Sequence, residues 1–143
     1  MLESPLRTGI DTALAAAQAG LDRLTPAQAW GAAQDGAVLV DIRPEFQRRA
    51  DGEVPGAIVI ERVHLEWRCD PTSYARIPEA TGSDVRWIVV CDEGYSSSLA
   101  AASLRGLGLR YATDVIDGFR AWRAAGLPVV RPSQPTPPRL FVA

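Results

Sequence analysis

The chain has 143 residues, 47% of them apolar, and a formal net charge of −2. These values predict one domain with its own hydrophobic core, and they argue against a nucleic-acid surface and against a need for disulfide or metal staples. Every basic residue is arginine, which excludes a Schiff-base lysine and any phosphate loop that depends on lysine.

Two helices are predicted at the start of the chain. Apolar residues recur at helical spacing from Thr8 to Gly20, and Gly20 can end that helix. Thr25 and Pro26 are typical of a helix start, and this second helix runs to about Gln34. We see no signal peptide and no apolar run long enough to span a bilayer, so we expect a cytoplasmic protein without a membrane partner.

Short apolar runs predict four buried strands, at 37–41, 57–60, 86–91 and 112–116. Between them we expect a turn at 52–56, short helical turns at 63–67 and 74–77, and helices at 96–105 and 117–125. Strands that alternate with helices indicate an α/β fold, in which a central, mostly parallel sheet carries helices on both faces. The Arg48-Arg49 pair is interpreted as a solvated face.

The loop Cys91-Asp-Glu-Gly-Tyr-Ser-Ser-Ser98 joins a predicted strand to a predicted helix. Such a loop directs successive backbone N–H groups into one concavity, and with the helix dipole it favours a thiolate. Cys91 is therefore a candidate nucleophile that needs no histidine partner. Gly94 permits the turn, and Ser96 or Ser97 can cap the helix and donate a hydroxyl to an anionic sulfur. From these residues alone, an inert buried cysteine remains an equal alternative.

Four segments, in order and at the right spacing, resemble the rhodanese-like domain family. They are Val38-Leu-Val-Asp-Ile-Arg43, Gly52-Glu-Val-Pro-Gly-Ala57, Cys91-Asp-Glu-Gly-Tyr-Ser96 and Asp117-Gly-Phe-Arg-Ala-Trp-Arg-Ala-Ala-Gly-Leu-Pro128. The resemblance implies a single rhodanese-like domain at 24–130. It leaves a helical N-terminal extension at 1–23, expected to pack on the domain, and a proline-rich C-terminal tail at 131–143.

This resemblance implies a sulfurtransferase. In the family, the loop cysteine takes sulfane sulfur from a donor such as thiosulfate or a persulfide, and holds it as a persulfide among backbone amides. A thiol acceptor, or cyanide in an assay, then removes it. Carried over, Cys91 is catalytic, Asp41 and Arg43 form a supporting ion pair, and no metal or cofactor is required. The implied substrate-binding positions of the loop are Asp92, Glu93, Gly94, Tyr95, Ser96 and Ser97.

Three positions bear on which chemistry the loop supports. Related phosphatases have a longer loop closed by an arginine, whereas here Ser96 closes the loop and the next arginine is Arg105, which favours sulfur transfer. Asp92 and Glu93 follow the nucleophile, where efficient thiosulfate users tend to carry basic residues. Two carboxylates there disfavour a thiolate and repel a dianionic donor. We therefore expect slow thiosulfate turnover and a protein or small-molecule persulfide as donor.

Residues outside the loop leave other hypotheses open. Four arginines are candidates to offset the loop carboxylates: Arg43, Arg62, Arg68 and Arg86. Glu53 stands where the family usually has histidine, and we expect a structural role for it. Cys69 could form a redox pair with Cys91, although an ordinary partly buried cysteine is the favoured interpretation. A catalytically weak binding or sensing module on the same fold is the main alternative to an enzyme.

Overall fold

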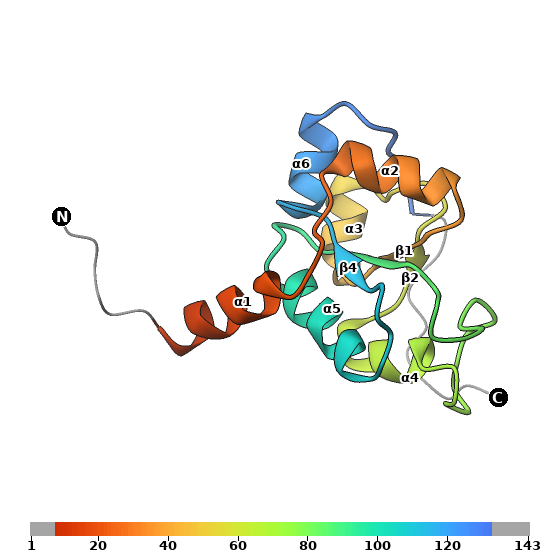
Figure 1. Cartoon of the computed structure of the whole chain (residues 1–143). Coiled ribbons are helices and arrows are strands. Elements are labelled where there is room, and N and C mark those ends of the chain that lie inside the picture. The colour runs from red at the N-terminus through yellow and green to blue at the C-terminus, as the bar shows by residue number, and fades with distance from the viewer. Residues whose placement is uncertain (1–7, 133–143) are drawn as a thin grey trace.

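The computed structural model describes residues 8–132, so most of the predicted C-terminal tail lies outside the described residues. Within that range the chain forms the predicted α/β fold (Figure 1). Four strands make one sheet in the order β2-β1-β3-β4, with every pairing parallel. They are β1 (Val38–Asp41), β2 (Ile58–Val59), β3 (Trp87–Val90) and β4 (Thr113–Asp114).

Six α-helices and one 3-10 helix are found in the described residues. They are α1 (Gly9–Ala19), α2 (Pro26–Gln34), α3 (Glu45–Asp51), η1 (Arg62–His64), α4 (Leu65–Cys69), α5 (Ser96–Gly106) and α6 (Gly118–Ala124). None of them has the length and apolar content that crossing a membrane requires.

Helices cover both faces of the sheet because successive strand residues point to opposite sides. Val40, Trp87 and Val89 lie in one buried cluster together with side chains from α4 and α5. Leu39, Ile88 and Val90 lie in the other cluster, with side chains from α2 and α6. The strands are thus buried on both sides, as their continuous apolar sequences predict.

The first two helices begin and end as the sequence predicts. Thr8 and Thr25 each form a capping box with the residue three positions later, and Pro26 occupies the first turn of α2. Gly20 is the C-cap of α1. Figure 1 shows α1 projecting from the body, with its C-terminal end beside α5.

The structure differs from the sequence predictions around α3 and α4. At 74–77 no helix forms, and a single turn is closed by the hydrogen bond from Arg76 N–H to the carbonyl oxygen of Ser73, at 3.3 Å. By contrast, α3 is a helix that apolar periodicity does not reveal. The residue that α3 buries is Arg48, so the interpretation of Arg48 as solvated is wrong. Its guanidinium forms an ion pair with Glu53, while Arg49 is exposed. Glu53 therefore takes the structural role expected for it.

Candidate active site

The sulfur of Cys91 lies directly beyond β3, at the carboxyl end of the central strands. Its Sγ accepts hydrogen bonds from the backbone N–H of Gly94 at 3.1 Å and of Ser97 at 3.3 Å. Ser97 is in the first turn of the eleven-residue helix α5, whose positive dipole end therefore faces the sulfur. Amides fixed in this way stabilise negative charge on sulfur.

The loop holds this shape because it packs against the start of α6. Gly94 has a φ of +86°, and a Cβ there would stand 2.6 Å from the backbone N of Asp117. A Cβ on Gly118 would stand 2.5 Å from the carbonyl oxygen of Cys91. That oxygen accepts a hydrogen bond from Phe119 N–H at 2.8 Å. Glycine at both positions thus allows the close backbone contact that fixes the loop.

A pocket of about 270 Å³ opens over Cys91. Cys91 itself is only 5% exposed, so a ligand reaches its sulfur through this pocket. The lining side chains come from the end of β1, from α3 and from the loop; they are Ile42, Arg43, Pro44, Gln47, Cys91, Asp92, Glu93, Tyr95 and Ser96. Gly94 and Ser97 are buried, and they contribute their backbone amides.

Asp41 holds Arg43 in a buried ion pair beside the pocket, as the sequence predicts. The guanidinium donates to both carboxylate oxygens, with the shortest contact at 2.7 Å, and to the carbonyl oxygen of Gly52. It also stacks on the ring of Phe119, 3.8 Å from the centroid. Since its charge is matched by Asp41, Arg43 supports the site without adding a free cation to it.

The loop carboxylates have a partner that the sequence does not point to. Arg120, from α6, donates to Asp92 at 2.9 Å and lies 4.0 Å from Glu93. The hydrogen bond that Arg120 donates to Asp92, together with the charges of Asp92 and Glu93, raises the pKa of Arg120. One arginine thus offsets two acidic side chains at the mouth of the pocket.

Three of the four arginines considered from the sequence are engaged elsewhere. Arg62 pairs with Glu66, Arg68 donates to a backbone carbonyl, and so does Arg86. Arg43 alone among the four lines the pocket, and Asp41 already matches its charge. The positive charge that offsets Asp92 and Glu93 therefore comes from Arg120 of α6, which follows the loop in the sequence.

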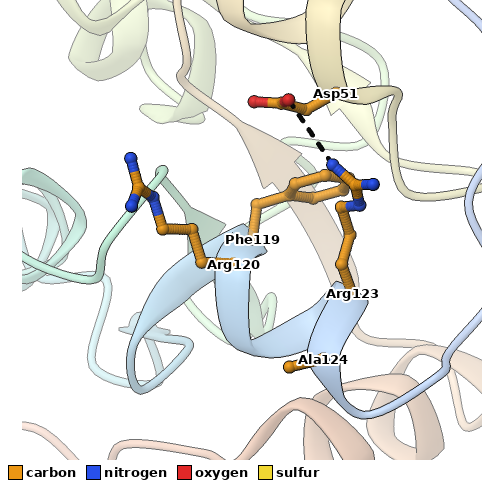
Figure 2. Close-up of a pocket in the computed structure, with 5 residues that line it drawn as sticks. All are labelled: Asp51, Phe119, Arg120, Arg123 and Ala124. Atoms are coloured by element: carbon orange, nitrogen blue, oxygen red, sulfur yellow. Dashed lines mark hydrogen bonds and ion pairs between the residues drawn. The ribbon is translucent and has the colours of Figure 1, made fainter.

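A second, more open hollow of about 480 Å³ lies beside the loop (Figure 2). In that view Arg120 and Arg123 extend on either side of Phe119, and Arg123 reaches Asp51 at 3.4 Å. No cysteine lines this hollow. The chemistry of the site therefore belongs to the smaller pocket over Cys91.

The hydroxyl of Ser97 is used differently from the prediction, whereas Ser96 lines the pocket over Cys91 and a role for its hydroxyl toward sulfur stays a prediction. Tyr95, not a serine, is the N-cap of α5, and no side chain caps that helix. The hydroxyl of Ser97 donates to the buried carboxylate of Asp114 at 2.7 Å, so it is not a donor to sulfur. The acceptor comes from β4, and no local pattern in the sequence links it to the loop. Ser97 contributes its backbone N–H to the sulfur instead.

The other cysteine is unsuited to a redox pair. Cys69 is fully buried in the cluster beneath α4 and α5. Burial, reinforced by the charge of Glu66, raises the pKa of its thiol to about 12. Cys69 thus remains a protonated thiol at neutral pH, and its surroundings are more buried than the sequence interpretation assumed.

The sequence model of the rhodanese-like domain family matches residues 25–125. The chain belongs to this family. Thiosulfate sulfurtransferase GlpE of Pseudomonas entomophila is 37% identical over 102 residues, which are 71% of this chain and 84% of that protein. The protein of the same name from Haemophilus influenzae is 36% identical over 106 residues, 74% of this chain and 91% of its own. Both of these relatives carry the name of a thiosulfate sulfurtransferase.

A solved structure from Rhodopseudomonas palustris is also similar, with a TM-score of 0.78 and 31% identity. The match covers 90% of this chain and 99% of that one. That protein is described as of unknown function and as a possible tyrosine phosphatase. The rhodanese-like fold is thus shared over nearly the whole chain, and the loop chemistry must decide between the two activities.

Proposed function

We propose that this chain is a rhodanese-type sulfurtransferase in which Cys91 carries the sulfur as a persulfide. The observation that supports this assignment most is the environment of Cys91, whose Sγ accepts two backbone N–H groups at the floor of a pocket. A group that cycles between thiolate and persulfide anion gains from donors that are already oriented before the reaction.

The first half-reaction loads the protein. The Cys91 thiolate attacks the outer sulfur of the donor, an S–S bond forms at Sγ, and the donor's own S–S bond breaks. With thiosulfate, sulfite leaves with the electron pair of the broken bond. The product is a Cys91 persulfide whose terminal sulfur carries the negative charge. Loop amides and the start of α5 surround that charge in place of water.

The second half-reaction unloads the protein. An acceptor thiolate attacks the terminal sulfur, the bond between that sulfur and Sγ breaks, and Cys91 regains its thiolate. Cyanide does the same in an assay and gives thiocyanate. Tyr95 and Glu93, both exposed at the rim of the pocket, are among the first groups that an acceptor meets.

The charges at the rim of the pocket indicate which sulfur donor is preferred. Arg120 offsets Asp92 and Glu93, but Arg120 is exposed and lies outside the lining of the pocket. A dianion such as thiosulfate therefore meets two carboxylates before it reaches the sulfur. We expect a persulfide of lower charge, on a small molecule or a protein, to be the preferred donor. Such chemistry requires a reduced thiol, which agrees with the cytoplasmic location expected from the sequence.

Phosphate hydrolysis is the second candidate because of the similar structure from Rhodopseudomonas palustris. A phosphate bound in this loop needs a bidentate arginine. In the described part of the chain, Arg43 is held by Asp41, and Arg105 donates to the carbonyl of Ala112. The hydroxyl of Ser97 donates to Asp114 and is not directed at a phosphate. The loop from Cys91 to Ser96 thus offers amides to a single sulfur anion and has no arginine of its own for a phosphate group.

A coupled assay separates these activities. The wild type, Cys91→Ser and Cys69→Ser are each given a persulfide or thiosulfate with cyanide, and in parallel an aryl phosphate. We expect thiocyanate from the wild type and from Cys69→Ser, none from Cys91→Ser, and no phosphate release above background. Phosphate release that depends on Cys91, without thiocyanate, would establish the phosphatase instead. If neither thiocyanate nor phosphate is formed, a binding or sensing module is the remaining function.

A further inference from the structure

A buried polar network lies beneath the loop, on the side away from the pocket. At its centre is Asp114, which is 0% exposed. Its carboxylate accepts hydrogen bonds from the hydroxyls of Ser97 at 2.7 Å and Ser98 at 2.8 Å. Arg23 neutralises it with a bidentate contact, at 2.9 Å to one oxygen and 3.2 Å to the other.

The same network holds the loop at Gly94. Arg23 donates to the carbonyl oxygen of Gly94 at 2.9 Å through the same Nη2 that contacts Asp114. The hydroxyl of Ser98 lies 3.2 Å from that carbonyl oxygen, and Gln18 donates to the Ser98 oxygen at 3.2 Å. One planar guanidinium therefore joins β4 to the turn of the loop.

The two residues that this network grips, Gly94 and Ser97, are the two whose N–H groups bind Cys91 Sγ. The side chain of Ser97 fixes the first turn of α5, and the carbonyl of Gly94 fixes the turn before it. From this coincidence we propose that Arg23 and Asp114 are positioning residues for sulfur transfer. They hold the amide donors in the geometry that an anionic sulfur needs.

Charge gives the arrangement a second consequence. Without Arg23, the buried carboxylate of Asp114 would be an uncompensated negative charge behind the loop. That charge would oppose the anionic sulfur on the other side of the same amides. Arg23 therefore acts on the reaction through orientation and through charge, although it is not among the residues that line the pocket.

Arg23 also comes from a part of the chain outside the family match. Gln18 lies in α1 and Arg23 in the segment that follows it, whereas the family model begins at residue 25. The predicted N-terminal extension thus contacts the underside of the catalytic loop. The proposal rests on the sulfurtransferase function and adds that this extension completes the site.

Single-turnover loading tests the proposal with a matched pair of arginine variants. Arg23→Gln removes the contacts to Asp114 and Gly94. Arg105→Gln is the control, because Arg105 also approaches this segment, at 3.9 Å from Asp22, but it lies at the far end of α5. Persulfide formation on Cys91 is followed by intact mass after addition of thiosulfate, and thermal unfolding is recorded for each variant.

Complete loss of one oriented hydrogen-bond donor slows a reaction by roughly 10²-fold. Because Arg23→Gln only displaces the amide donors, we expect it to load at least about tenfold more slowly than the wild type. The loss should appear in the maximal rate of loading, with little change in the thiosulfate concentration that gives half of that rate. Arg23→Lys should retain part of the wild-type rate, because lysine keeps the positive charge but lacks the planar guanidinium that makes the bidentate contact. Arg105→Gln should load at the wild-type rate.

Loading of folded Arg23→Gln at the wild-type rate would overturn the proposal, as would an equal loss in Arg105→Gln. Should Arg23→Gln lose its cooperative unfolding transition, Ser98→Ala carries the same test. Alkylation of Cys91 by iodoacetamide, which needs no sulfur donor, is measured in parallel. A wild type that takes up no sulfur would contradict the proposed function, while slower alkylation of Arg23→Gln would still support the positioning role.

Discussion

Gly94 lies so close to Asp117 that a Cβ on the glycine would stand 2.6 Å from the backbone nitrogen of the aspartate. This contact packs the loop that follows Cys91 against the start of α6. It also requires the positive φ of +86° at Gly94, which orients its N–H toward Cys91 Sγ. The shape of the sulfur site therefore depends on two backbone segments that are more than twenty residues apart in the sequence.

Replacing Gly94 by alanine should abolish sulfur transfer, because the new methyl group has no space and must push the loop away from α6. Gly108→Ala is the matched control. Gly108 also has a positive φ, +91°, but nothing lies within 4 Å of its Cβ position. The left-handed backbone alone should cost each variant about 1–2 kcal/mol of stability, and Gly94→Ala should lose more because its methyl group has no space. Thiocyanate production at saturating donor should fall only in Gly94→Ala. Equal activity of the two variants would contradict the packing argument.

Donor charge should determine the effect of substitutions at the rim. Arg120→Gln removes the partner of Asp92, so the KM for thiosulfate should rise several-fold, whereas Asp92→Asn should lower it. Arg123→Gln, on the same helix but paired with Asp51, is the control. These differences should shrink at high ionic strength, where exposed charges are screened. A KM for thiosulfate that neither Arg120→Gln nor Asp92→Asn changes would argue against electrostatic selection of the donor.

Two neighbouring arginines of α3 should differ strongly in their effect on stability. Arg48 is buried and paired with Glu53, so Arg48→Ala leaves a partly buried carboxylate without its partner and should cost about 3–5 kcal/mol. Arg49→Ala removes an exposed pair with Glu45 and should cost about 0.3–0.5 kcal/mol. Urea denaturation of both variants measures the difference. Similar losses would show that the Arg48 pair is not the anchor of this helix.

The thiol of Cys69 should make the protein less stable in alkali. Its pKa is about 12 in the folded protein against 9.0 for an ordinary thiol. Above about pH 9 the unfolded chain releases this proton and the folded chain keeps it, so the free energy of unfolding falls as pH rises toward 12. The slope from this group is at most about 1.4 kcal/mol per pH unit. Cys69→Ala should show a shallower decline in urea titrations between about pH 9 and about pH 10.5. Identical slopes would mean that Cys69 ionises freely in the fold.

The sequence predicts those parts of the structure that depend on local pattern. Short apolar runs identify the strands, and capping residues identify the first two helices. The pair of Asp41 and Arg43 is foreseeable because both lie at the carboxyl end of one strand. Helix α3 cannot be predicted from the sequence pattern because it has no apolar stripe, and the residue that it buries is the charged Arg48. A hydrophobic pattern cannot reveal a helix that is anchored by an ion pair.

The contacts that complete the candidate site are long-range and were not predictable. Ser97 and Asp114 are 17 positions apart, and Asp92 and Arg120 are 28 apart. Only the fold brings β4 and α6 to the two sides of the loop that follows Cys91. For that reason the sequence suggests the Ser97 hydroxyl as a donor to sulfur, whereas in the structure it donates to the buried carboxylate of Asp114.

Intact mass spectrometry of the wild type after incubation with a persulfide donor tests the central role of Cys91 most directly. We predict that the wild type gains one sulfur atom, that reductant removes it, and that peptide mapping places it on Cys91. Cys69→Ser should gain the same sulfur atom, and Cys91→Ser should not. A wild-type chain that gains no sulfur from either a persulfide or thiosulfate, or a gain that persists in Cys91→Ser, would contradict it.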